Sequence, residues 1–157
     1  MATLAELTDS YLAGVAKLKA VVKGMTKEQA LSRPVPGKWS TVECVCHLAD
    51  FEPIFADRVK RILAFDKPMI WAADENDYAK ALSYQERDLD EEVGVVDAVR
   101  RSTARLLKAQ PESASQRMGN HNLRGMMTLE QVLQIAVNHL THHMKHLEDK
   151  RKALGLA

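Results

Sequence analysis

Apolar residues recur at helical spacing in four long segments of this chain, and each segment opens with a side chain suited to cap a helix. The opening motifs are Thr3–Glu6, Ser40–Glu43, Asp88–Glu91 and Thr128–Gln131. The first segment is expected to end at Lys23 and Gly24, the second at about Phe65, and the fourth close to Gly155. The pattern therefore predicts four amphipathic helices.

Proline and glycine mark where these helices are interrupted. Thr26–Gln29 predicts one extra helical turn, which Pro34 and Pro36 would end. Pro53 lies inside the second helix and is expected to kink or interrupt it, because proline lacks a backbone donor and clashes with the preceding turn.

Four such helices without convincing strands predict an all-α fold, a four-helix bundle formed by a single domain over residues 1–157. The two remaining stretches, 66–87 and 110–127, are long connectors. Because connectors of that length can return the chain from one end of a bundle to the other, we expect an order other than simple up-down-up-down.

Composition narrows the classes of partner. Lys and Arg total 22 against 21 for Asp and Glu, a net charge of +1, so the chain lacks the basic surface typical of proteins that bind nucleic acid or anionic lipid. No stretch approaches the roughly 18 apolar residues of a membrane span, and no secretory signal is legible. Cys44 and Cys46 are expected to be buried structural thiols. A cytoplasmic protein that acts on a small molecule is the expectation.

Four of the six histidines lie in the last helix, and helical geometry separates them into two pairs. His139 and His143 are one turn apart and border the apolar stripe, whereas His142 and His146 point further towards solvent. Two imidazoles at this spacing form the half-site that zinc proteases build with H-E-x-x-H. Because no glutamate follows His139, the protease interpretation fails.

A durable metal site needs a third ligand, and His47 is the natural candidate because it lies on the apolar stripe of the second helix. A buried histidine is more often hydrogen-bonded than metal-bound, so both interpretations stay open at this point. His121 could reach the site as a fourth ligand, although a solvated loop histidine is the simpler interpretation. The acidic run 74–77 predicts a helix cap or a solvent-exposed loop. Such a loop could also cover a pocket at the end of the bundle.

Several motifs together resemble the DinB-like (DinB/YfiT) superfamily. They are Pro36–Ser40 followed by Glu43, then His47–Asp50, Arg58–Ile62, Gly125 with Thr128 and Leu129, and His139-x-x-x-His143. The resemblance covers nearly the whole chain. It implies a four-helix bundle in which His47, His139 and His143 hold one divalent metal ion.

Three neutral imidazoles suit nickel, zinc, iron or manganese, and three protein ligands leave a coordination position open. Characterised members of the superfamily use bacillithiol, mycothiol or glutathione, so the resemblance implies a thiol-dependent transferase as the leading hypothesis. A metal-dependent hydrolase is the second, and a non-catalytic, stress-related metal-binding module the third. The resemblance also implies a possible homodimer. The apolar girth of the second helix, meaning the apolar residues that lie around its circumference, is compatible with an extra buried face: Val42, Val45, Leu48, Phe51, Ile54, Phe55, Val59 and Ile62.

Overall fold

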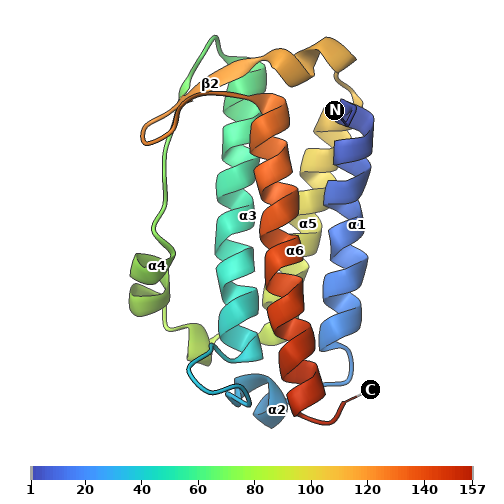
Figure 1. The fold of residues 1–157 in the computed structure, drawn as a ribbon, viewed down its shortest axis with the longest axis vertical. Coiled ribbons are helices and arrows are strands. Elements are labelled where there is room, and N and C mark those ends of the chain that lie inside the picture. The colour runs from blue at the N-terminus through green and yellow to red at the C-terminus, as the bar shows by residue number, and fades with distance from the viewer. Residues whose placement is uncertain (1, 157) are drawn as a thin grey trace.

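Four long helices dominate the structure, a computed structural model that describes residues 2–156. They are α1 (Leu4–Val22), α3 (Thr41–Ala64), α5 (Leu89–Lys108) and α6 (Leu129–Ala153). Two short α-helices and two short 3-10 helices lie in the connections between them: α2 (Lys27–Leu31), α4 (Glu75–Ala81), η1 (Tyr84–Glu86) and η2 (Glu112–Gln116). The predicted four-helix bundle is confirmed, and α2 is the predicted extra turn (Figure 1).

The helices begin where the capping residues predict. The side chains of Thr3, Ser40 and Thr128 each accept a hydrogen bond from the backbone N–H three residues on, and that third residue bonds back to the cap. Asp88 caps α5 by accepting from the backbone N–H groups of Asp90 and Glu91, without the return bond of a capping box. Because each cap satisfies orphan donors locally, the start of a helix can be predicted from a few residues.

The order of the bundle is not up-down-up-down. In Figure 1, α1 descends, α3 and α5 both ascend, and α6 descends. Helices α1 and α3 each pack against both α5 and α6, so α1 and α3 lie diagonally opposite. The connection from α3 to α5 therefore runs the length of the bundle, as its length predicts.

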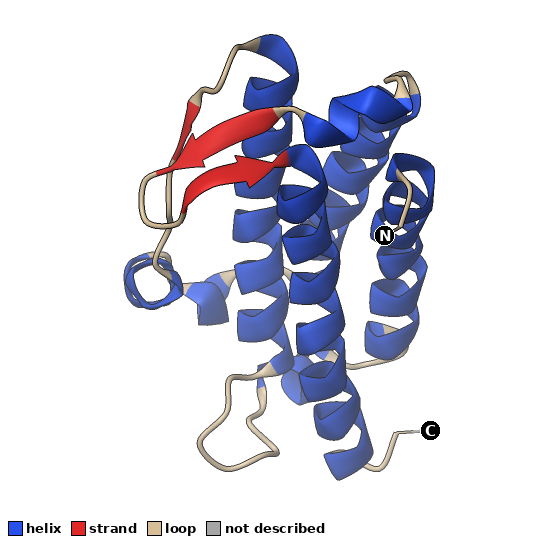
Figure 2. Ribbon diagram, turned by 45° about the horizontal axis from the view of Figure 1, so that its top comes forward, coloured by secondary structure: helices blue, strands red, loops and turns tan. Residues whose placement is uncertain are grey.

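A small three-stranded sheet joins the two long connectors, and the sequence analysis did not predict it (Figure 2). Strand β1 (Met69–Ile70) pairs in parallel with β2 (Met118–His121), which pairs antiparallel with β3 (Gly125–Thr128). The sheet lies against α3, where a Cβ at Gly119 would come within 2.9 Å of Ile62 Cγ1. Glycine at this position therefore permits the close approach.

Helix α3 runs through Pro53 without a break, so the predicted interruption is wrong. Proline costs about 3 kcal/mol inside a helix, chiefly through one lost hydrogen bond and a steric clash. Apolar residues on both sides of Pro53 are buried in the bundle and hold the two halves in line: Val42, Val45, Leu48, Phe55, Val59 and Ile62.

The same burial removes one argument for a homodimer, namely that the apolar residues of α3 form a surface for a second copy of the chain. Of the apolar girth described above, only Phe51 and Ile54 are partly exposed, and the rest is covered by the chain's own helices. A homodimer thus stays a prediction without support from this surface. None of the helices in the described range is both long and apolar enough to cross a membrane.

A buried ionic network links all four long helices. Arg100 on α5 is fully buried and donates hydrogen bonds to the Tyr11 carbonyl on α1 at 2.6 Å and to the Ala136 carbonyl on α6 at 3.0 Å. It also pairs with the carboxylate of Glu52 on α3, which accepts a 2.8 Å hydrogen bond from the Tyr11 hydroxyl. The network holds α3 and α6 together about one turn from His139.

Candidate metal centre

Three histidines from two helices meet inside the bundle. His47 comes from α3, and His139 and His143 come from α6. One ring nitrogen from each lies within 4.8 Å of the others, and the Nε2 atoms of His47 and His139 are 2.8 Å apart. The structure thus brings together the three residues that the sequence analysis selected.

Aromatic rings surround these imidazoles and fix their orientation. The ring of Trp39 lies 5.5 Å from that of His47, and the ring of Phe51 lies 4.5 Å from it. Phe55 packs 5.4 Å from the ring of His139. Because the walls are aromatic, the histidine nitrogens face one another in a setting with few competing polar groups.

Burial keeps all three imidazoles neutral at physiological pH. It lowers the pKa of His47 to about 4, with Asp50 opposing the shift. Burial also lowers the pKa values of His139 and His143, and the neighbouring imidazoles lower them further because a second positive charge would be repelled. Neutral imidazole is the form that binds metal ions.

The three rings have more hydrogen-bonding capacity than the chain satisfies. The Nδ1 atoms of His47 and His139 are buried and have no partner among residues 2–156. Nitrogens around a tetrahedral zinc ion lie about 3.3 Å apart. This value falls between the 2.8 Å that separates the Nε2 atoms of His47 and His139 and the 4.8 Å limit for the whole set. The donor set therefore fits a divalent cation, which would bind the lone pairs that converge between the rings.

Cys44 lies behind His143, with Sγ 3.6 Å from Nδ1. Burial raises the pKa of the Cys44 thiol to about 11, so it stays protonated and is poorly suited to be a ligand itself. It is placed instead to orient the His143 ring through Nδ1. Cys46 is also buried, on another face of α3, where its thiol contacts the Tyr84 carbonyl at 3.5 Å. Both cysteines are free and buried, as predicted.

The sequence analysis gave no role to Glu75, which lies beside the histidines. Its Oε2 is 3.6 Å from His47 Nε2, and its side chain is 53% exposed. Asp74 is the predicted helix cap, accepting a 2.8 Å hydrogen bond from the Asn76 N–H, and Glu75 begins α4. The only signal for Glu75 was an acidic run in a connector that could hang over a pocket.

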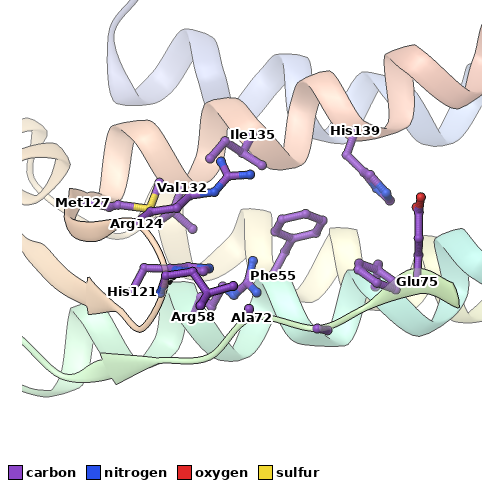
Figure 3. A pocket seen from close by; sticks show the side chains of 13 residues that line it. Phe55, Arg58, Ala72, Glu75, His121, Arg124, Met127, Val132, Ile135 and His139 are labelled. Carbon is purple, nitrogen blue, oxygen red and sulfur yellow. Dashed lines mark hydrogen bonds between the residues drawn. The ribbon is translucent and has the colours of Figure 1, made fainter. Parts of the chain in front are cut away.

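A cavity of about 300 Å³ opens beside the histidines, at the lower end of the range for small-molecule sites (Figure 3). Glu75 and His139 lie at one end, with the Glu75 carboxylate pointing towards His139. Phe55 lies in the middle, and Arg58, His121 and Arg124 lie at the other end. The cavity therefore borders the histidine cluster at His139.

The other candidate histidines lie elsewhere. His121 is 6% exposed in β2, so the interpretation as a solvated loop residue is wrong, and it lines the cavity away from the three-histidine cluster. His142 and His146 pair with each other on the outside of α6, with their Nε2 atoms 3.3 Å apart. Neither belongs to the cluster in the described part of the chain.

Comparison with known proteins identifies relatives over most of the chain. A family model described as the DinB superfamily matches residues 11–147. A Geobacillus thermodenitrificans protein named "Putative metal-dependent hydrolase" is 26% identical over 99% of this chain and 84% of its own length. A Bacillus licheniformis protein with a similar name is 27% identical over 88% of this chain and 79% of its own. The solved structure of Bacillus subtilis YfiT is titled a "probable metal-dependent hydrolase with an unusual four-helix bundle topology". It has the same fold, with a TM-score of 0.87, and is 24% identical over 96% of this chain and 87% of its own.

Proposed function

Because the chain belongs to the DinB superfamily, we propose that it is a metal-dependent hydrolase in which His47, His139 and His143 hold one divalent cation. The observation that carries the proposal is the convergence of three neutral imidazoles, one of which, His139, lines a cavity. The names of the relatives support the same class of reaction.

Three imidazoles suit zinc, nickel, iron or manganese, and three protein ligands leave at least one coordination position open, as is typical of catalytic sites. When bound, such a cation supplies a nucleophile at neutral pH by lowering the pKa of a water molecule to about 7. His47, His139 and His143 would bind the ion, and the aromatic rings around them would limit the access of bulk water.

Glu75 is the residue placed to move a proton. Its carboxylate lies 3.6 Å from His47 Nε2, borders the cavity, and is half-exposed, so it can exchange protons with solvent between turnovers. We assign Glu75 Oε2 as the acceptor of the proton that the attacking water loses.

Thiol-dependent transfer is the competing function, which the family resemblance implies. The same carboxylate could take the proton of a thiol S–H, leaving the thiolate as the nucleophile. Only the identity of the nucleophile then separates the two reactions. The measurement that separates them is turnover of an activated ester by metal-loaded protein with and without added low-molecular-weight thiol. A hydrolase needs no thiol, whereas a strict thiol requirement would contradict our proposal.

Ligand assignment is tested by elemental analysis of purified variants. We expect His47→Ala, His139→Ala and His143→Ala each to lose bound metal, and His142→Ala, on the outer face of the same helix, to retain it. Circular dichroism checks that each variant is folded. Metal loss from His142→Ala but not from His139→Ala would overturn the assignment.

Glu75→Gln tests the role of the carboxylate. We expect this variant to keep its metal and lose at least about 100-fold in turnover, the usual contribution of general acid–base catalysis. Loss of the metal itself would show that Glu75 is a ligand instead of a base.

A further inference from the structure

The end of the cavity away from the histidine cluster is basic. Arg58 reaches it from α3, His121 from β2, and Arg124 from the turn that joins β2 to β3 (Figure 3). Two separate segments of the chain, α3 and the β2–β3 hairpin, thus place nitrogen donors at one end of a small cavity. The sheet that the sequence did not predict is what brings them together.

Neither guanidinium has a carboxylate partner in the described part of the chain. Within residues 2–156, no ion pair involves Arg58 or Arg124, and Arg58 donates its Nε and Nη2 hydrogens to the carbonyl of Trp71. The neighbouring Asp57 is paired with Arg61 at 2.6 Å. Burial and repulsion by Arg124 lower the pKa of Arg58, with Asp57 acting in the opposite direction. The charge at this end of the cavity is therefore only weakly compensated by the protein.

His121 adds a neutral donor to this end. Its Nδ1 accepts a 3.2 Å hydrogen bond from the Leu123 N–H, so a neutral ring carries its proton on Nε2. Burial and the charges of Arg58 and Arg124 lower its pKa, which keeps the ring neutral. A cavity end with two guanidinium groups and one N–H donor is suited to an oxyanion.

Apolar side chains separate the basic end from the histidine cluster. Phe55 and Ile135 lie between the two ends in Figure 3, and Met127 and Val132 line the cavity beside Arg124. A ligand that spans the cavity therefore needs an apolar body between a charged end and a reacting end.

We propose that the cavity binds a substrate whose apolar body ends in a carboxylate or a phosphate, with this oxyanion at Arg58, His121 and Arg124 and the reacting bond beside Glu75 and His139. The placement of the reacting bond rests on the proposed hydrolase function. The anion subsite does not, because it is built from residues outside the metal cluster. This anion subsite assigns the substrate to the class of small organic anions.

Binding of matched probes tests the subsite directly. Isothermal titration with 3-phenylpropanoate, phenethyl phosphate and neutral 3-phenylpropanamide is carried out on protein freed of metal by chelation, so that no cation competes for the anion. We expect the preferred anion to bind at least about 10-fold more tightly than the amide, since hydrogen bonds between guanidinium groups and an oxyanion are about twice as strong as those between neutral groups. The two anions together show whether carboxylate or phosphate is preferred.

Arg124→Gln is the decisive variant, because its exposed side chain forms no ion pair in the described chain and the substitution should leave the fold intact. We expect it to weaken anion binding about 10-fold and leave amide binding unchanged. Arg105→Gln, an equal loss of charge on the exposed surface of α5, should match the parent protein. Equal affinity for anion and amide, or equal behaviour of the two variants, would overturn the proposal.

The two proposals can fail separately. If His139→Ala binds no metal yet still binds the anion through Arg124, the subsite stands whatever becomes of the hydrolase. If the metal-loaded protein hydrolyses neutral and anionic esters equally well, and Arg124→Gln changes neither rate, the hydrolase stands and the subsite is wrong.

Discussion

Replacing Arg100 by methionine should destabilise the protein strongly. The substitution keeps a long unbranched side chain but leaves the Glu52 carboxylate fully buried without its cation. It also removes the donors to the carbonyls of Tyr11 and Ala136. Breaking a buried ion pair from one side costs about 3–5 kcal/mol, because the desolvated partner charge stays behind. For a chain of this length, that corresponds to a fall in Tm of roughly 6–20 °C.

Urea denaturation followed by circular dichroism measures the loss. Arg101→Met is the matched control, since Arg101 is the next residue of α5, is largely exposed and pairs with Asp97 on the surface. That pair should contribute only about 0–1 kcal/mol. If Arg100→Met lies within about 1 kcal/mol of Arg101→Met, the reasoning is refuted.

The double variant Glu52→Leu with Arg100→Met distinguishes a stranded charge from lost packing. Removing both charges should recover part of the stability lost in the single variant, because the cost of the unpaired carboxylate disappears. A double variant that is less stable than Arg100→Met would show that packing around the guanidinium dominates. The network also joins α3 to α6 beside His139, so Arg100→Met should weaken metal binding, which titration with zinc measures.

Three further outcomes are expected in urea denaturation. Gly14→Ala should destabilise by about 1–3 kcal/mol, because the new Cβ would lie 2.2 Å from Leu140 Cδ2, whereas Gly94→Ala, with nothing within 4 Å, should stabilise by about 0.5–1 kcal/mol. Equal effects at the two glycines would contradict this. Ser40→Ala should cost about 1 kcal/mol through loss of the α3 cap, and an unchanged midpoint would count against the cap. In metal-free protein the pKa of His47 is lowered to about 4, so between pH 4 and pH 6.5 this histidine binds a proton when the chain unfolds. The free energy of unfolding is therefore highest above the unfolded pKa of 6.5 and decreases as the pH falls towards 4. The expected decrease from this group is about 2 kcal/mol between pH 7.5 and pH 5. A stability that does not change with pH would contradict the shift.

The helices could be predicted because their signals are local. A capping residue such as Ser40 fixes the start of a helix through bonds that span three residues, and the apolar stripe that follows fixes its buried face. The same periodicity placed His139 and His143 on one side of α6 and His142 on the other. The interruption expected at Pro53 failed because a local penalty was outweighed by burial along the rest of α3.

The sheet and the residues it positions could not be predicted in the same way. Strand β1 has two residues, and its partner Asn120 lies about fifty positions along the chain from Met69, so no periodic pattern reports the pairing. Because β1 leads directly into the segment before α4, this pairing also decides where Glu75 lies. It likewise carries His121 and Arg124 to the cavity. Residues that depend on contacts between distant connectors were therefore missed, whereas those on one helix face were found.

The buried polar side chains of the bundle differ in whether other side chains offer them a partner. Glu52 and Arg100 carry opposite charges that meet each other, so their burial is consistent with a structural role. His47 and His139 instead bury Nδ1 atoms without partners, at a cost of about 1–3 kcal/mol for each unsatisfied group. Apolar residues in their place would stabilise the same core. A fold that keeps two imidazoles with unpartnered Nδ1 atoms between two helices, next to an opening, loses stability there, and such a loss is expected where a site serves binding or catalysis.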